Sequence, residues 1–128
     1  HGQPQALTDI SRMPTLSMRT VGTEHSWRFV DADSKPAELI HVPCLSTDDL
    51  HTLRRAAIQG VGVACLPTVF IADDLSSGEL VRLLPSLSAR AGVVHAVFPS
   101  RRGMVPAVRA LLDSLSDGFA ANPLLRGE

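Results

Sequence analysis

The sequence predicts an α/β domain, and three stretches of the chain lead to this fold class. Trp27 and Phe29 alternate with polar neighbours, which is the period of a strand. From Ser46 the apolar spacing changes to about 3.6 residues, the period of a helix, and residues 61–66 then form a short apolar run that ends at Pro67. A strand, a helix and a buried strand in this order predict a right-handed parallel crossover.

The length and composition are those of one ordinary globular domain. The 128 residues are 45% apolar, with 12 Lys and Arg against 13 Asp and Glu and a net charge of −1. This near-equal number of positive and negative side chains excludes a uniformly basic surface of the kind that binds nucleic acid without sequence specificity. No apolar run is long enough to span a membrane, and the first residues do not resemble a secretory signal. We therefore expect a cytoplasmic protein with no membrane partner.

The first half of the chain is predicted to contain a connector and a hairpin. Residues 6–10 have room for one or two helical turns, which Pro14 closes. Residues 26–30 are expected to form a strand, residues 31–36 a turn, and residues 38–45 the second strand of the hairpin.

A helix is predicted to follow the hairpin directly. Ser46, with Asp49 three residues on, fits a capping box, and Gly60 stands where a helix needs a left-handed stop. The apolar side chains that fall on one face of this helix are Leu50, Leu53, Ala57 and Ile58. The apolar run that follows is expected to be a strand covered on both faces.

The second half is predicted to continue the sheet and to end in a long helix. A shorter helix over residues 69–77 ends at Gly78, and residues 79–84 and 93–98 are expected to be strands. The last helix has Pro106 in its first turn. Its apolar stripe consists of Val108, Leu111, Leu112, Leu115 and Phe119.

The sequence predicts no enzyme, no cofactor and no metal site. It lacks a Walker loop, a nucleophile elbow and a pair of histidines at helical spacing. The glycines at 60 and 62 follow a helix and precede a strand, the reverse of the dinucleotide-binding order. Arg101 and Arg102 form either a fork for a carboxylate or phosphate or two solvated side chains.

Cys44 and Cys65 are expected to be reduced and buried. They are too few for a disulfide scaffold and do not form a C-x-x-C pair. An apolar strand around Cys65 raises the pKa of a thiol and hides its sulfur, which disfavours a role as nucleophile.

Ser46 and Thr47 are the strongest candidates for contact with a ligand. The first-turn amides of a helix, with neighbouring hydroxyls, form a polar recognition point at the carboxyl end of a parallel strand. Alternatively, Ser46 is only a helix cap. Asp48 and Asp49 already complement the helix dipole, which argues against a strongly anionic ligand.

Several short sequence motifs, taken in their order along the chain, resemble those of the effector-binding domain of LysR-type bacterial transcriptional regulators. The first are H-G-Q-P with a later L-T-D-I, and W-R-F in the first strand. L-R-R-A-A-I-Q-G-V-G-V-A-C-L-P, at residues 53–67, resembles the most recognisable block of that family. The closing phrases are G-E-L-V, L-P, V-F-P-S-R-R and P-A-V-R-A-L-L. Cys65 and Phe98 depart from the usual family residues without changing the interpretation.

The resemblance implies an α/β fold of the type 2 periplasmic-binding-protein-like class, present in part. Residues 1–97 correspond to most of the second subdomain, residues 98–119 to a return segment that packs on the first subdomain, and residues 120–128 to a flexible tail. The family's N-terminal winged helix-turn-helix, its linker helix and the first half of the effector domain are expected to precede His1.

The implied function is the sensing of a small-molecule effector in the cleft between two subdomains, which biases how regulator protomers assemble on promoter DNA. By family analogy this chain contributes Ser46, Thr47, Pro67 and Thr68 to the wall of that cleft. The resemblance also implies a homo-oligomer that contacts DNA only through the absent N-terminal winged helix-turn-helix. The competing interpretation is a solute-binding protein of a transport system, because the same fold serves both functions.

Overall fold

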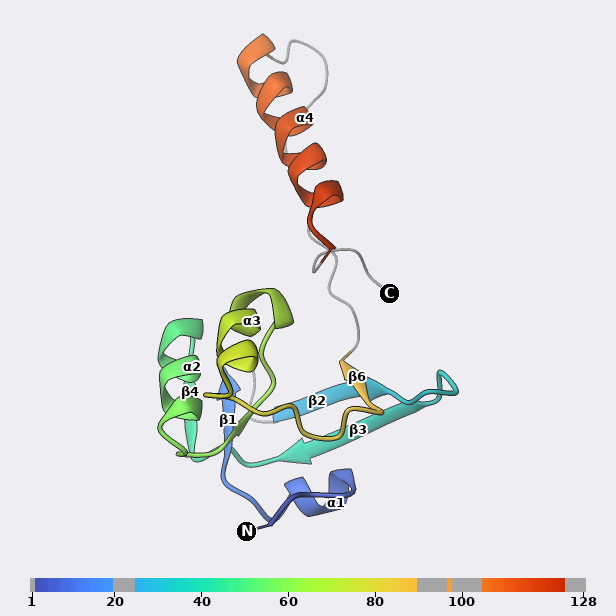
Figure 1. The fold of residues 1–128 in the computed structure, drawn as a ribbon, viewed down its shortest axis with the longest axis vertical. Coiled ribbons are helices and arrows are strands. Elements are labelled where there is room, and N and C mark those ends of the chain that lie inside the picture. Colours follow the sequence, from blue (N-terminus) through green and yellow to red (C-terminus); the bar gives the residue numbers. More distant parts are fainter. Residues whose placement is uncertain (1, 20–24, 90–96, 98–104, 124–128) are drawn as a thin grey trace. The chain divides into compact units, whose positions relative to one another are not determined.

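The computed structural model describes residues 2–19, 25–89, 97 and 105–123 (Figure 1). The chain divides into two compact units, residues 1–90 and residues 91–128, and each is described on its own. The first unit contains two three-stranded sheets, and the second contains a long helix. In the described residues, no helix combines the length and the apolar character that a membrane span requires.

The first sheet is parallel and carries the predicted crossover. Strand β1 (Thr15–Met18) lies in the centre, between β4 (Leu45–Thr47) and β5 (Val63–Ala64), and both pairings are parallel. Helix α2 (Leu50–Ile58) connects β4 to β5 and packs against β1 and β5. The predicted parallel crossover through α2 is therefore found, but the strand that enters it is β4 and not the predicted strand at residues 38–45, which belongs to the other sheet.

The central strand β1 was not among the predicted elements. Its residues alternate between polar and apolar, but only four residues separate Pro14 from Arg19. Thr15, Leu16 and Ser17 are all buried. So short a segment has no periodicity of its own, and its position depends on strands that lie far along the chain.

The second sheet consists of the predicted hairpin and a short third strand. β2 (His25–Val30) pairs antiparallel with β3 (Pro36–His41) and with β6 (Ser88–Ala89). A turn joins β2 to β3, and in it the Asp31 carboxylate accepts hydrogen bonds from the Asp33 and Lys35 amides.

The second strand of the hairpin ends at His41, so the prediction that it runs to residue 45 was wrong. Pro43 has no backbone N–H to donate to the hydrogen bonds between strands, and the chain crosses to the parallel sheet at this point. The Cys44 amide donates to the Thr15 carbonyl at 2.8 Å, and β4 then begins beside β1.

Helix α2 begins three residues later than predicted, because its N-cap is not Ser46, and the predicted capping box was wrong. Its N-cap is Asp49, whose carboxylate accepts from the His51 and Thr52 amides, while Ser46 remains in β4. A carboxylate at this position satisfies the first-turn amides and complements the helix dipole. The predicted stop at Gly60 is confirmed, because its φ is +73° and its amide donates to the Ala57 carbonyl.

The apolar run at residues 61–66 contributes only the two-residue strand β5, which pairs with β1 alone among the described strands. The expectation of a strand covered on both faces was therefore wrong, and β5 is half-buried. Residues 79–84 form no strand, which corrects another prediction. The predicted strand at residues 93–98 lies outside the described residues except for Val97.

The remaining helices follow the sequence patterns. Helix α3 (Thr68–Ser77) ends at Gly78 in the left-handed conformation, and the short helix α1 (Leu7–Ile10) precedes Pro14. Helix α4 (Pro106–Ala121) has Pro at its start, as predicted, and continues two residues beyond Phe119. Among the described residues of the second unit, α4 has no buried side chain.

A bidentate ion pair joins α2 to α3, two helices that lie side by side in Figure 1. The Asp74 side chain is 3% exposed, whereas the Arg54 side chain is 32% exposed. The Arg54 guanidinium lowers the pKa of Asp74 from its ordinary 3.8, so the pair stabilises the fold above about pH 4 and the contribution is lost as the pH falls further.

We expect Arg54→Leu to lower the melting temperature more than Asp74→Asn at neutral pH. Removal of Arg54 leaves a buried carboxylate unpaired, whereas Arg54 can turn to water when Asp74 loses its charge. The deficit of Arg54→Leu should shrink towards acidic pH, because the unpaired carboxyl then takes up a proton. Thermal unfolding of both variants as a function of pH measures this. If both variants lost the same amount of melting temperature at all pH values, the expected difference between Arg54→Leu and Asp74→Asn would be contradicted.

Candidate functional site

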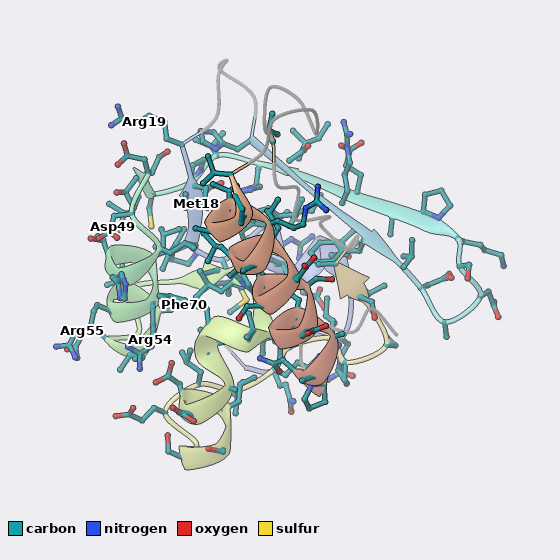
Figure 2. The ribbon with its side chains drawn as sticks, turned by 90° about the horizontal axis from the view of Figure 1, so that it is seen from above. Met18, Arg19, Asp49, Arg54, Arg55 and Phe70 are labelled. Atoms are coloured by element: carbon teal, nitrogen blue, oxygen red, sulfur yellow. The ribbon has the colours of Figure 1, made fainter. Side chains whose placement is uncertain are left out.

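The carboxyl edge of the parallel sheet gathers the residues that the sequence singled out. Because β1, β4 and β5 are parallel, their carboxyl ends lie at one edge, and helices α2 and α3 both begin there. Figure 2 labels Met18 at the end of β1, Asp49 at the start of α2 and Phe70 in the first turn of α3. The His51 ring meets the edge of the Phe70 ring at 4.9 Å between centroids, which brings the two helix starts together.

Ser46 and Thr47 lie on opposite faces of this sheet. Ser46 pairs with Ser17, and Thr47 pairs with Met18, and successive residues of a strand point to opposite faces. Both are half-buried. The sequence placed these two hydroxyls together at a helix start, but the strand separates them, so only one of them can face a given ligand.

The Thr47 hydroxyl already has a structural partner. Its Oγ1 accepts from the Asp49 amide at 3.2 Å, and its carbonyl accepts from the Arg19 amide at 2.7 Å. In the described part of the chain the Ser46 hydroxyl has no such bond and does not cap α2. Of the two roles that the sequence left open for Ser46, the cap is therefore excluded.

The two helix starts at this edge differ in charge. At α2, the Thr52 hydroxyl and the His51 amide hold the pKa of Asp49 below its ordinary 3.8, so a carboxylate occupies the positive end of the helix dipole. At α3, the N-cap is Pro67, which has no side chain able to accept from the first-turn amides, and the first turn holds no acidic residue. Thr68 and these amides thus form the more electropositive of the two starts.

A cavity of about 340 Å³ lies in the first unit, and Thr68 is the one predicted site residue that lines it. Its walls are mostly apolar and come from both sheets, α1, α3 and the segment that follows α3. Cys65 also lines this cavity, and burial raises the pKa of its thiol, in agreement with the expected low reactivity. Cys44 is exposed and Cys65 is half-buried, so the expectation that both cysteines are buried was wrong for Cys44 and holds only in part for Cys65.

A buried polar cluster on the face of β1 that carries Thr15 and Ser17 was not predicted from the sequence. The Thr15 hydroxyl contacts the His41 imidazole at 2.7 Å, and the Ser17 hydroxyl contacts the His25 imidazole at 3.1 Å. The signal was the alternation of Thr15 and Ser17 about an apolar residue, which places two hydroxyls on one face of a strand.

The other sequence candidates give no site. Within the described ranges, no three His, Cys, Asp or Glu side chains come close enough to hold a metal ion. Arg101 and Arg102 lie outside the described residues, so their two alternative roles remain as the sequence left them.

Comparisons with known proteins agree on one family. The family model described as the LysR substrate binding domain matches residues 1–120. The chain is 29% identical over 115 residues to the HTH-type transcriptional regulator PtxR of Pseudomonas aeruginosa, a match that covers 90% of this chain and 36% of PtxR. It is 26% identical over 123 residues to the HTH-type transcriptional regulator CrgA of Neisseria meningitidis, covering 95% of this chain and 40% of CrgA.

The fold is also similar to a solved structure, the regulatory domain of AphB in Vibrio vulnificus. The TM-score is 0.63 at 23% sequence identity, over 70% of this chain and 44% of that one. The chain thus spans less than half the length of each of these three proteins. It belongs to the LysR substrate-binding domain family and has the type 2 periplasmic-binding-protein-like α/β fold that the sequence predicted.

Proposed function

We propose that this chain is part of the sensor of a LysR-type transcriptional regulator and that it binds a small-molecule effector. The match of the LysR substrate-binding domain over residues 1–120 carries this proposal, and the relatives are transcriptional regulators rather than enzymes. In this proposal residues 1–97 form most of the second subdomain, residues 98–119 return to the first subdomain, and residues 120–128 form a tail. Effector binding closes the cleft between the subdomains and shifts the arrangement of protomers on promoter DNA.

The proposed contact surface is the carboxyl edge of the parallel sheet, where Pro67 and Thr68 lie with either Ser46 or Thr47, whichever of the two hydroxyls shares the face that the effector contacts. The exposed Thr68 and the uncapped first turn of α3 support a contact with acceptor atoms of the effector. The carboxylate of Asp49 at the start of α2 repels an anion there. The effector should therefore be neutral or weakly charged where it meets α2, with its oxygen or nitrogen acceptors turned towards α3.

Thr68→Val and Ser46→Ala test this surface on the full-length regulator. A thermal-shift screen of small metabolites identifies the effector, and calorimetry then measures its affinity for each variant. A hydrogen bond from either hydroxyl should appear as a loss of about 0.5–1.5 kcal/mol of binding free energy. Thr47→Val is a less direct probe, because it also removes the acceptor of the Asp49 amide.

Thr8→Val is the matched control, because Thr8 is exposed and lies in α1, before the amino end of β1. It should leave the affinity unchanged. If Thr68→Val and Ser46→Ala also leave the affinity unchanged, these two residues do not belong to the effector site.

We expect this chain alone to have no specific affinity for DNA. Its charge is balanced, with a net value of −1, and the basic recognition helix of a regulator is proposed to lie in the winged helix-turn-helix that precedes it. A titration with promoter DNA at near-physiological salt measures this. Tight, sequence-dependent binding would refute the assignment of DNA contact to that preceding domain.

We expect this chain to self-associate through α4. Val108, Leu111 and Leu115 are 42%, 57% and 47% exposed, and in the whole regulator the first subdomain is proposed to cover them. Without that cover, the stripe should pair with a second copy or exchange segments. Sedimentation equilibrium should show an oligomer for the chain and a monomer for Leu111→Asp.

Ala110→Asp places the same charge on the opposite face of α4 and should leave the oligomer intact. A well-folded monomer of the unchanged chain at high concentration would contradict the expected self-association.

A further inference from the structure

Two hydroxyl–imidazole contacts connect the two sheets of the first unit. His41, at the end of β3, is 8% exposed, and its Nδ1 lies 2.7 Å from the hydroxyl of Thr15 on β1. Thr15 is 1% exposed, so this contact is fully enclosed. Beside it, the His25 Nδ1 lies 3.1 Å from the Ser17 hydroxyl. The proposed effector function uses neither histidine.

The hydrogen bonds around Thr15 favour a neutral His41. The Thr15 hydroxyl lies 2.7 Å from His41 Nδ1 and also contacts the Val42 carbonyl at 3.5 Å, and either neutral tautomer of the imidazole fits this contact. The Nε2 atom of His41 is buried without a hydrogen-bond partner among the described residues. A doubly protonated His41 would therefore carry a buried positive charge with an N–H that no acceptor faces.

The groups that face His41 also favour its neutral form. Trp27 lies at 4.3 Å between ring centroids and His25 at 6.0 Å, both from β2, and β1 contributes the neutral Thr15. Arg28 and Glu38 pair with each other at the other face of the hairpin. Burial, and then the charge of His25, hold the pKa of His41 below its ordinary 6.5.

We propose that the contact between His41 and Thr15 is an acid-sensitive latch that holds the hairpin β2–β3 against the parallel sheet. In the closed state His41 stays neutral, whereas a released His41 takes up a proton from water once the pH falls below about 6.5. The open state therefore binds more protons, and the latch weakens as the pH falls from about 6.5 towards the lower pKa of the closed state. Above about pH 6.5 the latch is at full strength.

The latch also controls the connection to β4. The Cys44 amide, three residues after His41, donates to the Thr15 carbonyl at 2.8 Å. When the hairpin leaves β1, this amide loses its partner and becomes open to exchange with solvent. The Val61 amide, which donates to the Ala56 carbonyl at the end of α2, does not depend on the latch.

Two measurements on the unchanged chain test the latch. In an NMR titration, the imidazole of His41 should titrate below the ordinary histidine pKa of 6.5. The hydrogen-exchange protection factor of the Cys44 amide, relative to Val61, should fall up to about tenfold for each pH unit between the two ionisations of His41. A His41 midpoint at or above the ordinary 6.5, or an unchanged ratio of the two protection factors, would overturn the proposal.

His41→Phe provides an independent test, because it keeps a ring beside Trp27 but cannot take up a proton. It should lose most of the fall in melting temperature that the unchanged chain shows between about pH 7.5 and 5.5. His51→Gln is the control and should keep that fall. An unaltered pH dependence in His41→Phe would overturn the latch, and if this variant does not fold, the titration of the unchanged chain decides the question.

Discussion

Gly62→Ala should lower the free energy of unfolding by about 3 kcal/mol, as measured by urea denaturation. A Cβ atom at this position would lie 2.5 Å from the carbonyl oxygen of Pro14 and 2.9 Å from its carbonyl carbon. The Pro14 carbonyl cannot move away freely, because it accepts from the Val63 amide at 2.8 Å. The added methyl group would therefore push β5 away from β1 beside the pair Thr15 and Val63, where the two strands meet.

Gly60→Ala is the matched control, two residues earlier in the chain. Its φ of +73° makes alanine strained, but no atom lies within 4 Å of the added Cβ. We expect a smaller loss of about 1–2 kcal/mol, from backbone strain alone. Equal losses in the two variants would mean that the close approach of Gly62 to Pro14 does not constrain the sheet.

Leu53→Ala should cost about 2–5 kcal/mol, the range for truncation of a fully buried leucine. Leu53 is 1% exposed and lies on α2, which packs against the central strand β1. Only a few apolar side chains of the described residues are as well buried, so truncation of Leu53 removes a large part of the apolar core. At the upper end of this range the variant would be largely unfolded at room temperature.

Val42→Ala provides the control, because Val42 is 94% exposed in the connection between the two sheets. Its free energy of unfolding should change by no more than about 0.5 kcal/mol. A loss for Leu53→Ala as small as that of Val42→Ala would contradict the packing of α2 on the parallel sheet.

The helices of this fold could be predicted from the sequence, whereas parts of its sheets could not. The apolar spacing from Leu50 to Ile58 and the glycines at 60 and 78 are local signals, and α2 and α3 occur where these signals place them. Strand β1 is four residues long and is recognised only through its neighbours β4 and β5. Residues 79–84 show the reverse, because a stretch with strand-like residues forms no strand unless another strand pairs with it.

The candidate site was predictable as an edge of the sheet but not in its details. Parallel strands followed by helices place Thr47 and Thr68 at the same edge, and that much follows from the order of elements. The sequence could not decide whether Ser46 or Asp49 caps α2, because both residue types are good caps. Nor could it show the contact of His41 with Thr15, which joins residues of two different sheets.

The sequence that the gene encodes directly upstream of His1 distinguishes a regulator from a transport protein. We predict a winged helix-turn-helix, a long linker helix and then the first half of the effector-binding domain, because the chain matches regulators of which it spans 36% and 40%. Sequencing this region of the gene is the measurement. A secretory signal peptide in place of the helix-turn-helix would contradict the proposed regulator and identify a solute-binding protein of a transport system with the same fold.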